Sequence, residues 1–163
     1  MFTKLALRVL AVSAACAAFF SVAQAKSLDD IIKDGVIRIG VNPNFIPMSS
    51  PGADNQFQGF DIDVGNKIAE ALKVKAEFVP TETAQRVPFL VADKIDISLG
   101  ALTRNSERAK LIEYTAPLHT EVLAVLTTDK VDAKDWKEFN DGKYTLANMR
   151  GNWTVDWTKE NLP

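Results

Sequence analysis

The sequence is poor in the residues that build redox and metal centres, with one cysteine and one histidine among its 163 residues. The cysteine, Cys16, lies within a predicted secretory segment that is removed from the mature chain. The mature chain therefore has no thiol, which excludes a disulfide and a cysteine-ligated metal site. The histidine, His119, has no carboxylate, serine or second histidine at a helpful spacing, so we interpret it as a hinge residue rather than a catalytic base.

Other signatures of catalysis and of nucleic-acid binding are also missing. The sequence has no glycine-rich phosphate loop, zinc-ligand cluster or nucleophile elbow, and it shows no internal repeat. Without the two basic residues of the secretory segment, the chain carries 17 basic and 21 acidic residues, a net charge of −4. Nucleic acids and anionic membranes attract a basic excess, so neither is expected as a partner. We also expect no metal and no cofactor.

The first 25 residues have the pattern of a secretory signal peptide. Lys4 and Arg8 precede an apolar run over residues 9–22, which ends in the small-residue pattern Ala-Gln-Ala at residues 23–25. Cleavage is expected after Ala25. A transmembrane anchor is the alternative, but the run is short and interrupted by serine. A secreted, cysteine-free and mildly acidic domain suits the bacterial periplasm.

Hydrophobic periodicity then predicts alternating strands and helices. Ser27 can cap a short helix, and Asp61 and Asp63 stand where a second helix begins and are interpreted as its cap and dipole partners rather than a catalytic pair. Strands are expected over 36–41, 76–79 and 95–99, with helices over 61–72 and 83–92. This order is typical of an α/β fold with a parallel, doubly wound sheet.

A second lobe is expected to begin near His119 and to be incomplete at Pro163. Apolar runs predict strands over 121–127 and 144–148, and amphipathic patterns predict helices over 132–138 and 151–160. The expected organisation is a signal peptide (1–25), a first α/β lobe (26–118) and the start of a second α/β lobe (119–163). One strand-helix-strand-helix run is too short to close a sheet with two covered faces.

The end of the strand over 95–99 is the expected binding site. Gly100, Ala101, Thr103 and Arg108 follow this strand, and ligands of open α/β sheets bind beyond the carboxyl ends of the strands. An arginine there can hold a carboxylate through two parallel hydrogen bonds, and a threonine hydroxyl can add a third. The sequence thus predicts a receptor for a small molecule that carries an anionic group.

Four ordered blocks make the chain resemble the periplasmic amino-acid-binding proteins of ABC transporters, the family 3 extracellular solute-binding proteins. The blocks are 59–63 (GFDID), 85–90 (QRVPFL), 94–96 (KID), and 103–110 (TRNSERAK) with 114–117 (YTAP). The resemblance covers residues 28–163. It implies a two-lobed type II periplasmic-binding-protein fold, with the first lobe nearly complete and the second partial, and no enzymatic activity. The implied partners are a free amino acid, with a polar or acidic side chain favoured, and the membrane permease of an ABC importer, and the protein is expected to be a monomer.

The resemblance also implies roles for particular residues. Arg108 would pair with the α-carboxylate of the ligand, beside Thr103 and the backbone of Gly100 and Ala101. Arg86 lies in a motif that resembles one used by binders of acidic amino acids, where it would hold a second carboxylate. In the loop over 42–50, Asn42 and Phe45 would touch the ligand side chain. In the second lobe, Asn152 and Trp153 replace the serine or threonine that family members usually carry at a helix start, so this part of the site departs from the pattern.

Structural alternatives remain open for several of these residues. Arg108 could pair with Glu107 or Glu113 on a solvated face, and Phe45 and Trp153 could be core residues. The rival function is a secreted cyclohexadienyl (arogenate or prephenate) dehydratase, which resembles the family in fold and would need catalytic acids in the second lobe. The family pattern includes further second-lobe strands and a return crossing. If the chain stops at Pro163, we expect an exposed apolar edge, weak or absent ligand binding and a tendency to aggregate.

Overall fold

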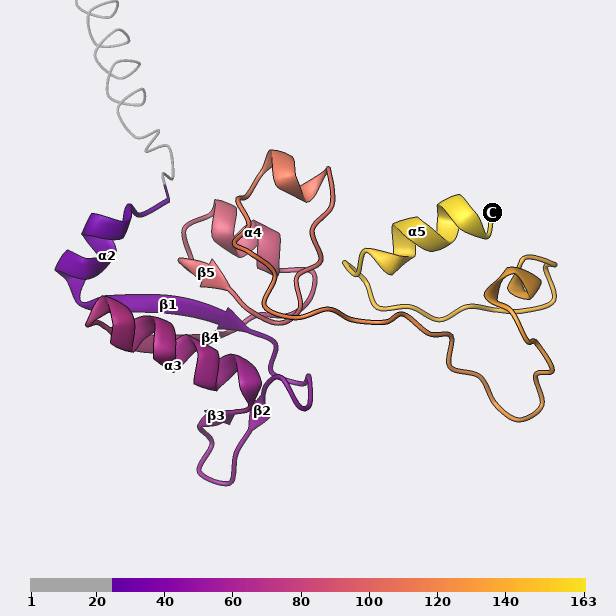
Figure 1. Ribbon diagram of the computed structural model, residues 1–163, viewed down its shortest axis with the longest axis horizontal. Coiled ribbons are helices and arrows are strands. Elements are labelled where there is room, and N and C mark those ends of the chain that lie inside the picture. The colour runs from indigo at the N-terminus through magenta and orange to yellow at the C-terminus, as the bar shows by residue number, and fades with distance from the viewer. Residues whose placement is uncertain (1–24) are drawn as a thin grey trace, which may run out of the picture.

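The computed structural model describes residues 25–163 of the chain (Figure 1). The predicted signal peptide lies outside the described residues, apart from Ala25. The centre of the structure is a three-stranded parallel sheet in the order β4-β1-β5, formed by β1 (Val36–Val41), β4 (Lys75–Pro80) and β5 (Ile97–Ser98). Within residues 25–163, no helix combines the length and the apolar character that a membrane crossing requires.

Strand β1 is the core of this sheet. All six of its residues pair in register with β4, and Ile39 and Gly40 pair with β5. Its alternating residues Ile37, Ile39 and Val41 are almost completely buried. A strand with neighbours on both sides and apolar residues toward the core is the expected centre of a parallel sheet, so the predicted strands over 36–41 and 76–79 are confirmed.

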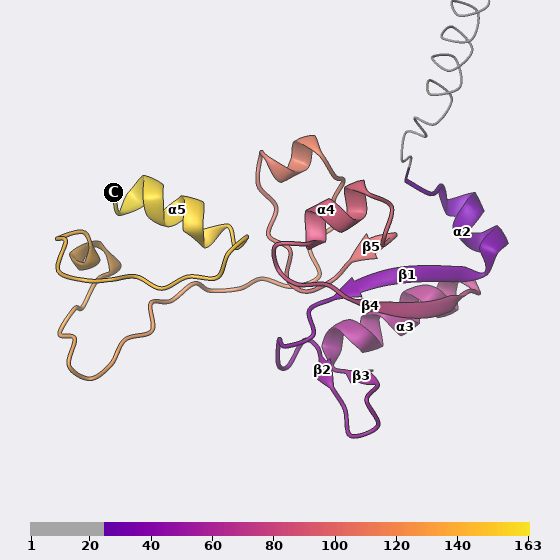
Figure 2. The same ribbon diagram turned by 180° about the vertical axis from the view of Figure 1, so that it is seen from behind.

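Three helices accompany the sheet: α2 (Leu28–Asp34), α3 (Phe60–Leu72) and α4 (Arg86–Val91). Helix α3 covers one face of β1 and β4, as the front and rear views show (Figures 1 and 2). Gly65 permits this close packing, because a Cβ atom there would lie 2.7 Å from the ring of Phe78. The predicted cap of α2 is confirmed, since Ser27 and Asp30 form a reciprocal capping box.

The predicted cap of α3 is wrong. The helix begins at Phe60 and its N-cap is Gly59, which has φ of +124° and makes no side-chain cap. Asp61 lies inside the first turn instead and is buried, with 2% exposure. Its carboxylate therefore faces the interior of the protein and not the free N–H groups at the helix start.

The elements that lead toward the expected binding site are shorter than predicted. Helix α4 begins at Arg86 rather than Thr83, and the β5 ladder comprises Ile97–Ser98 within the predicted 95–99 strand. Extended backbone nevertheless continues beyond the ladder, because the amide of Asp96 donates to the carbonyl of Arg38 and the amide of Leu99 donates to that of Gly40. A short antiparallel hairpin pairs β2 (Ser50–Pro51) with β3 (Phe57–Gln58).

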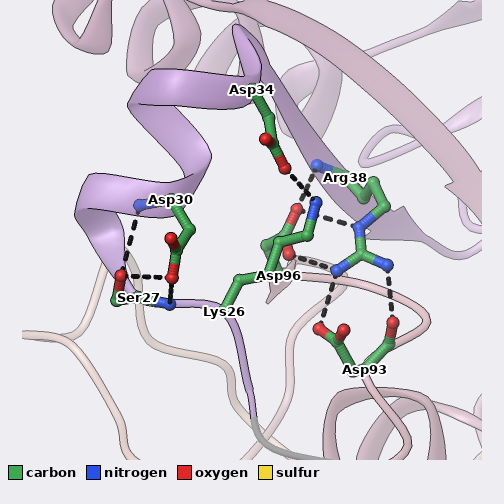
Figure 3. A network of polar contacts seen from close by, with 7 residues as sticks. All are labelled: Lys26, Ser27, Asp30, Asp34, Arg38, Asp93 and Asp96. Atoms are coloured by element: carbon green, nitrogen blue, oxygen red, sulfur yellow. Dashed lines mark hydrogen bonds and ion pairs between the residues drawn. The ribbon is translucent and has the colours of Figure 1, made fainter.

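A network of ion pairs links the central strand β1 to the segment that leads into β5 (Figure 3). The guanidinium of Arg38 on β1 contacts Asp96 Oδ1 at 2.5 Å and Asp93 Oδ1 at 2.8 Å, and its Nε donates to Asp96 Oδ2 at 3.1 Å. Burial works to raise the pKa of Asp96, but the hydrogen bonds from Arg38 outweigh it and hold the pKa below its ordinary value. Lys26 and Asp34 form a neighbouring, more exposed pair at 2.7 Å.

The two strands predicted in the second part of the chain are not formed. Residues 119–163 contain a 3₁₀ turn, η3 (Trp136–Phe139), and the helix α5 (Thr154–Asn161), joined by irregular segments that extend away from the sheet (Figure 1). A strand requires a partner for its backbone N–H and C=O groups. Within the described residues none pairs with 121–127 or 144–148, and Val122 and Leu126 are 96% and 98% exposed. The helix predicted over 132–138 is reduced to η3.

Candidate functional site

The chain turns sharply where β5 ends. Gly100 has φ of +96° and Ala101 has φ of +53°, so two successive residues occupy the left-handed region. This conformation suits glycine but is uncommon for alanine, and such strain collects at functional sites. The turn therefore lies where the sequence analysis expects a ligand, beyond the carboxyl end of a buried strand.

Arg108 is half-buried and lies beside this turn, in the 3₁₀ turn η2 (Arg108–Lys110). Its Nη1 donates to the carbonyl of Thr103 and its Nη2 donates to the carbonyl of Gly151, each at 2.8 Å. A guanidinium has five N–H donors, so three of them have no protein acceptor in the part of the chain that the structure describes. The alternative ion pairs are not formed, because Glu107 pairs with Lys110 at 2.6 Å and Arg108 forms no ion pair within residues 25–163.

Arg108 and the start of α5 both line a cleft of about 390 Å³. It lies between segments that are far apart in the sequence, the first α/β unit on one side and residues 151–156 on the other. The walls combine apolar side chains with the charges of Arg108, Glu107 and Asp156. The lining residues are Thr83, Ala84, Val87, Leu102, Asn105, Glu107, Arg108, Leu111, Gly151, Asn152, Val155 and Asp156.

The segment before α5 touches the first unit directly. Besides the bond from Arg108 to Gly151, the hydroxyl of Thr83 lies 3.1 Å from the sulfur of Met149. Gly151 has φ of +78°, and a Cβ atom there would lie 2.7 Å from the Cα of Ala84. Only glycine can approach this closely, so Gly151 allows the second part of the chain to close one side of the cleft.

Two predicted second-lobe residues take different positions at this helix start. Asn152 lines the cleft, and its Oδ1 accepts a hydrogen bond from the amide of Thr154 at 3.3 Å. Trp153 is the N-cap residue, is half-buried and is not among the lining residues. Helix α5 begins at Thr154, three residues later than the predicted start at Gly151.

The predicted first-loop contacts lie outside the cleft lining. Asn42 is buried, its Nδ2 donates to the Thr83 hydroxyl at 3.3 Å, and its Oδ1 accepts from the amide of Asn44 at 3.1 Å. Phe45 is half-buried and forms a two-way backbone bridge with Ser49, at 2.8 Å in each direction. Neither the core position nor the ligand contact considered for Phe45 is observed here, and its role as a ligand contact stays a prediction.

Arg86 is almost fully buried, with 5% exposure, behind the Gly100 turn. Its Nη1 donates to the carbonyl of Gly100, and its Nε donates to the carbonyl of Thr83 at 3.2 Å. Burial lowers the pKa of Arg86 to about 10. Like Gly100, Ala101 and Thr103, it is not one of the residues that line the cleft.

One acidic residue of the cleft was not singled out from the sequence. Asp156 lines the cleft and forms no ion pair within residues 25–163, and only the fold brings it to the cleft that Arg108 lines. Glu107, the sequence neighbour of Arg108, also lines the cleft but is paired with Lys110. Glu121 was also overlooked: its Oε1 lies 3.4 Å from His119 Nε2, so His119 does have a nearby carboxylate, contrary to the sequence interpretation.

The described residues contain no group of three or more histidine, cysteine, aspartate or glutamate side chains placed to hold a metal ion. The polar groups that line the cleft, among them Arg108, Asp156 and Asn152, can recognise charge and form hydrogen bonds. An arginine and an aspartate in one cleft suit a small molecule that carries both a carboxylate and an ammonium group.

Comparisons with known proteins show which family the chain resembles. The model of the bacterial extracellular solute-binding proteins, family 3, matches residues 37–157. The chain is 35% identical over 124 residues to the L-arginine-binding protein of Pseudomonas aeruginosa, which covers 76% of this chain and 46% of that protein. It is 30% identical over 95 residues to the cyclohexadienyl dehydratase of the same species, covering 58% of this chain and 35% of that enzyme.

A solved structure extends the match to the fold. An ancestral amino acid-binding protein, a precursor of cyclohexadienyl dehydratase, superposes with a TM-score of 0.78 at 31% identity. The match covers 85% of this chain and 62% of that one. The chain spans less than half the length of either curated relative.

Proposed function

Because the chain belongs to the bacterial extracellular solute-binding proteins of family 3, we propose that it captures a free amino acid in the periplasm and presents it to the permease of an ABC importer. Its fold is the α/β fold of type II periplasmic binding proteins, of which the chain covers part. The observation that carries the proposal is the cleft that Arg108 from the first part of the chain and Asp156 from the second part both line.

In this proposal the α-carboxylate of the ligand binds Arg108. The guanidinium is fixed in place by the carbonyls of Thr103 and Gly151 and keeps three N–H donors available. Two of these donors can form parallel hydrogen bonds to one carboxylate. Because the guanidinium is planar and holds both donors in place, this interaction is stronger than that between a carboxylate and a lysine. The backbone of Gly100 and Ala101 and the side chain of Thr103 complete this end of the site.

In the same proposal, the α-ammonium group of the ligand binds Asp156, which lines the cleft from the second part of the chain. Asp156 has no cationic partner within 25–163, whereas the Glu107 carboxylate is already paired with Lys110. Asn152 can add a hydrogen bond from the same wall. The ligand would then hold the two walls together, which is how a solute shifts a hinged receptor toward its closed form. The boundary between the two lobes is proposed near His119.

For the ligand side chain we propose a polar group. The preference for an acidic ligand rested on Arg86, whose described hydrogen bonds go to the backbone carbonyls of Gly100 and Thr83. Apolar residues of the cleft, including Val87, Leu102 and Val155, can pack against the aliphatic part of a longer side chain. We further propose that the protein is a monomer without nucleic-acid partners.

A binding screen tests the proposed function. The purified protein is heated with each of the twenty standard L-amino acids, and a true ligand at 100 times its dissociation constant should add about 2.7 kcal/mol to the free energy of unfolding. The α-amide and the Nα-acetyl derivative of each hit should bind at least about tenfold more weakly, because each derivative loses one of the two charges. Absence of a shift with every amino acid would refute the proposal for this chain.

The alternative function is that of a secreted cyclohexadienyl dehydratase. It is favoured by the 30% identity to the enzyme of Pseudomonas aeruginosa. Incubation with prephenate, followed by absorbance, distinguishes the two functions: turnover with no amino-acid binding would support the enzyme. Binding of an amino acid without turnover of prephenate would support the receptor.

Secretion through a cleavable signal peptide is a separate prediction. When the chain is expressed in a Gram-negative bacterium, intact-mass spectrometry of the periplasmic protein should give a chain that begins at Lys26. Ala25→Phe should block processing, because the cleavage site requires a small residue, whereas Gln24→Leu changes the tolerant middle position of the pattern. A periplasmic protein that still begins at Met1 would contradict the prediction.

A further inference from the structure

Two charged residues are buried beside the proposed site without a partner of opposite charge. Asp61 on α3 is 2% exposed and Arg86 on α4 is 5% exposed, and neither forms an ion pair within residues 25–163. Asp96 offers the contrast, because its buried carboxylate is bonded to Arg38. Oδ2 of Asp61 has no hydrogen-bond partner among the described residues.

Both residues meet Gly100. Arg86 Nη1 donates to the carbonyl of Gly100, and Oδ2 of Asp61 lies 3.9 Å from the place that a Cβ atom of Gly100 would occupy. Gly100 and Ala101 are the two successive left-handed residues that begin the site. Asp61 and Arg86 therefore converge on the strained turn from two different helices.

Burial makes both charges costly for the fold. It raises the pKa of Asp61, and the Gly100 amide acts in the opposite direction without cancelling the effect. His119, Arg86 and Glu121 are the other charged or titratable groups that act on Asp61. The pKa of Arg86 falls to about 10, again because of burial. Uncompensated buried charges are destabilising, so a purely structural role would be better served by neutral side chains.

We propose that Asp61 and Arg86 are positioning residues that hold the Gly100–Ala101 turn in its left-handed conformation for ligand binding. The inference rests on the proposed function, because the turn is taken to meet an amino acid. Arg86 restrains the carbonyl of Gly100 through a hydrogen bond. The Asp61 carboxylate lies beside the Cα atom of Gly100 and interacts with the Gly100 amide. The unfavourable burial is kept because a fixed turn needs no rearrangement when the ligand arrives.

The variant Asp61→Asn separates a positioning role from a structural one. It removes a buried charge at constant volume, so the melting temperature should rise by about 4 °C. At the same time the affinity for the amino acid found in the screen of the twenty standard L-amino acids should fall about tenfold, since the turn loses its charged restraint. Amide hydrogen exchange of Gly100 and Ala101 in the ligand-free protein should become about tenfold faster.

Asp63→Asn is the matched control, because Asp63 is in the same helical turn but is exposed. It should change neither the affinity nor the exchange rates. In the wild type, affinity should decline as pH falls through the raised pKa of Asp61, and the Asp61→Asn variant should lose this dependence.

Three outcomes are distinguishable. Loss of both melting temperature and affinity in Asp61→Asn would mean a structural role, and a higher melting temperature with unchanged affinity and exchange would mean that the burial is incidental. Each result overturns the inference. If the wild type binds no amino acid, the proposed function fails, and the exchange rates of the ligand-free protein still decide whether Asp61 holds the turn.

Discussion

Replacement of Arg108 by alanine is expected to weaken amino-acid binding by about 100-fold, while the fold is retained. The guanidinium is the cation on the first wall of the cleft, and three of its N–H donors are available to a carboxylate. Loss of a desolvated, hydrogen-bonded charge pair costs about 2 to 5 kcal/mol, and about 2.7 kcal/mol corresponds to 100-fold. Isothermal titration with the amino acid that the screen identifies measures the effect.

Two further variants test the cause of this loss. Arg104→Ala removes an exposed arginine from the same loop, one that does not line the cleft, and should leave the dissociation constant unchanged. Arg108→Lys keeps the positive charge but loses the planar guanidinium, which can donate two parallel hydrogen bonds to a carboxylate. It should therefore weaken binding by about tenfold. An Arg108→Ala variant that binds as tightly as the wild type would show that the ligand carboxylate is held elsewhere.

The fold of residues 28–80 follows closely from local sequence signals. The helix over 28–34 has a capping box and a terminal glycine, β1 has the apolar character of a buried parallel strand, and β4 alternates between exposed and partly buried residues. Each of these signals is contained in a short window. The misplaced cap of α3 shows the limit of such reasoning, because an aspartate at a helix start looks like a cap whether its side chain faces solvent or the core.

The second part of the chain could not be predicted in the same way. Residues 121–127 are as apolar as a buried strand, but a strand also needs neighbouring backbone, and the described residues supply none. Hydrophobic periodicity indicates which secondary structure a segment favours, but it does not indicate which other segment will pair with it. Helix α5 forms because its hydrogen bonds are internal.

The site was predictable where it follows a strand and not where it depends on tertiary contacts. The positions of Gly100, Ala101 and Arg108 beyond β5 follow from the order of the elements. The approach of Asp156 and Gly151 to Arg108 spans more than forty residues of sequence, and no local pattern encodes it. Burial of Arg86 is likewise a property of the packed helix and sheet.

Asp96→Asn is expected to lower the free energy of unfolding by about 2 to 3 kcal/mol, or the melting temperature by about 10 °C. The Asp96 side chain is 1% exposed and takes two hydrogen bonds from the Arg38 guanidinium and one from its backbone amide. Removal of its charge leaves Arg38 partly buried beside a neutral amide. The expected loss of unfolding free energy is at the low end for a broken buried ion pair, because 21% of the Arg38 side chain is exposed.

The pH dependence of the same variant identifies the cause. Because the folded pKa of Asp96 lies below the unfolded value of 3.8, its contribution is fully present above about pH 4 and is lost as pH falls through the folded pKa. The stability difference between wild type and Asp96→Asn should therefore shrink in acid. Glu70→Gln, which breaks the exposed Lys67–Glu70 pair of 80% and 71% exposure, should cost at most about 0.5 kcal/mol. Equal losses in the two variants, measured by urea denaturation, would show that burial of the Arg38 network contributes nothing beyond an ordinary surface pair.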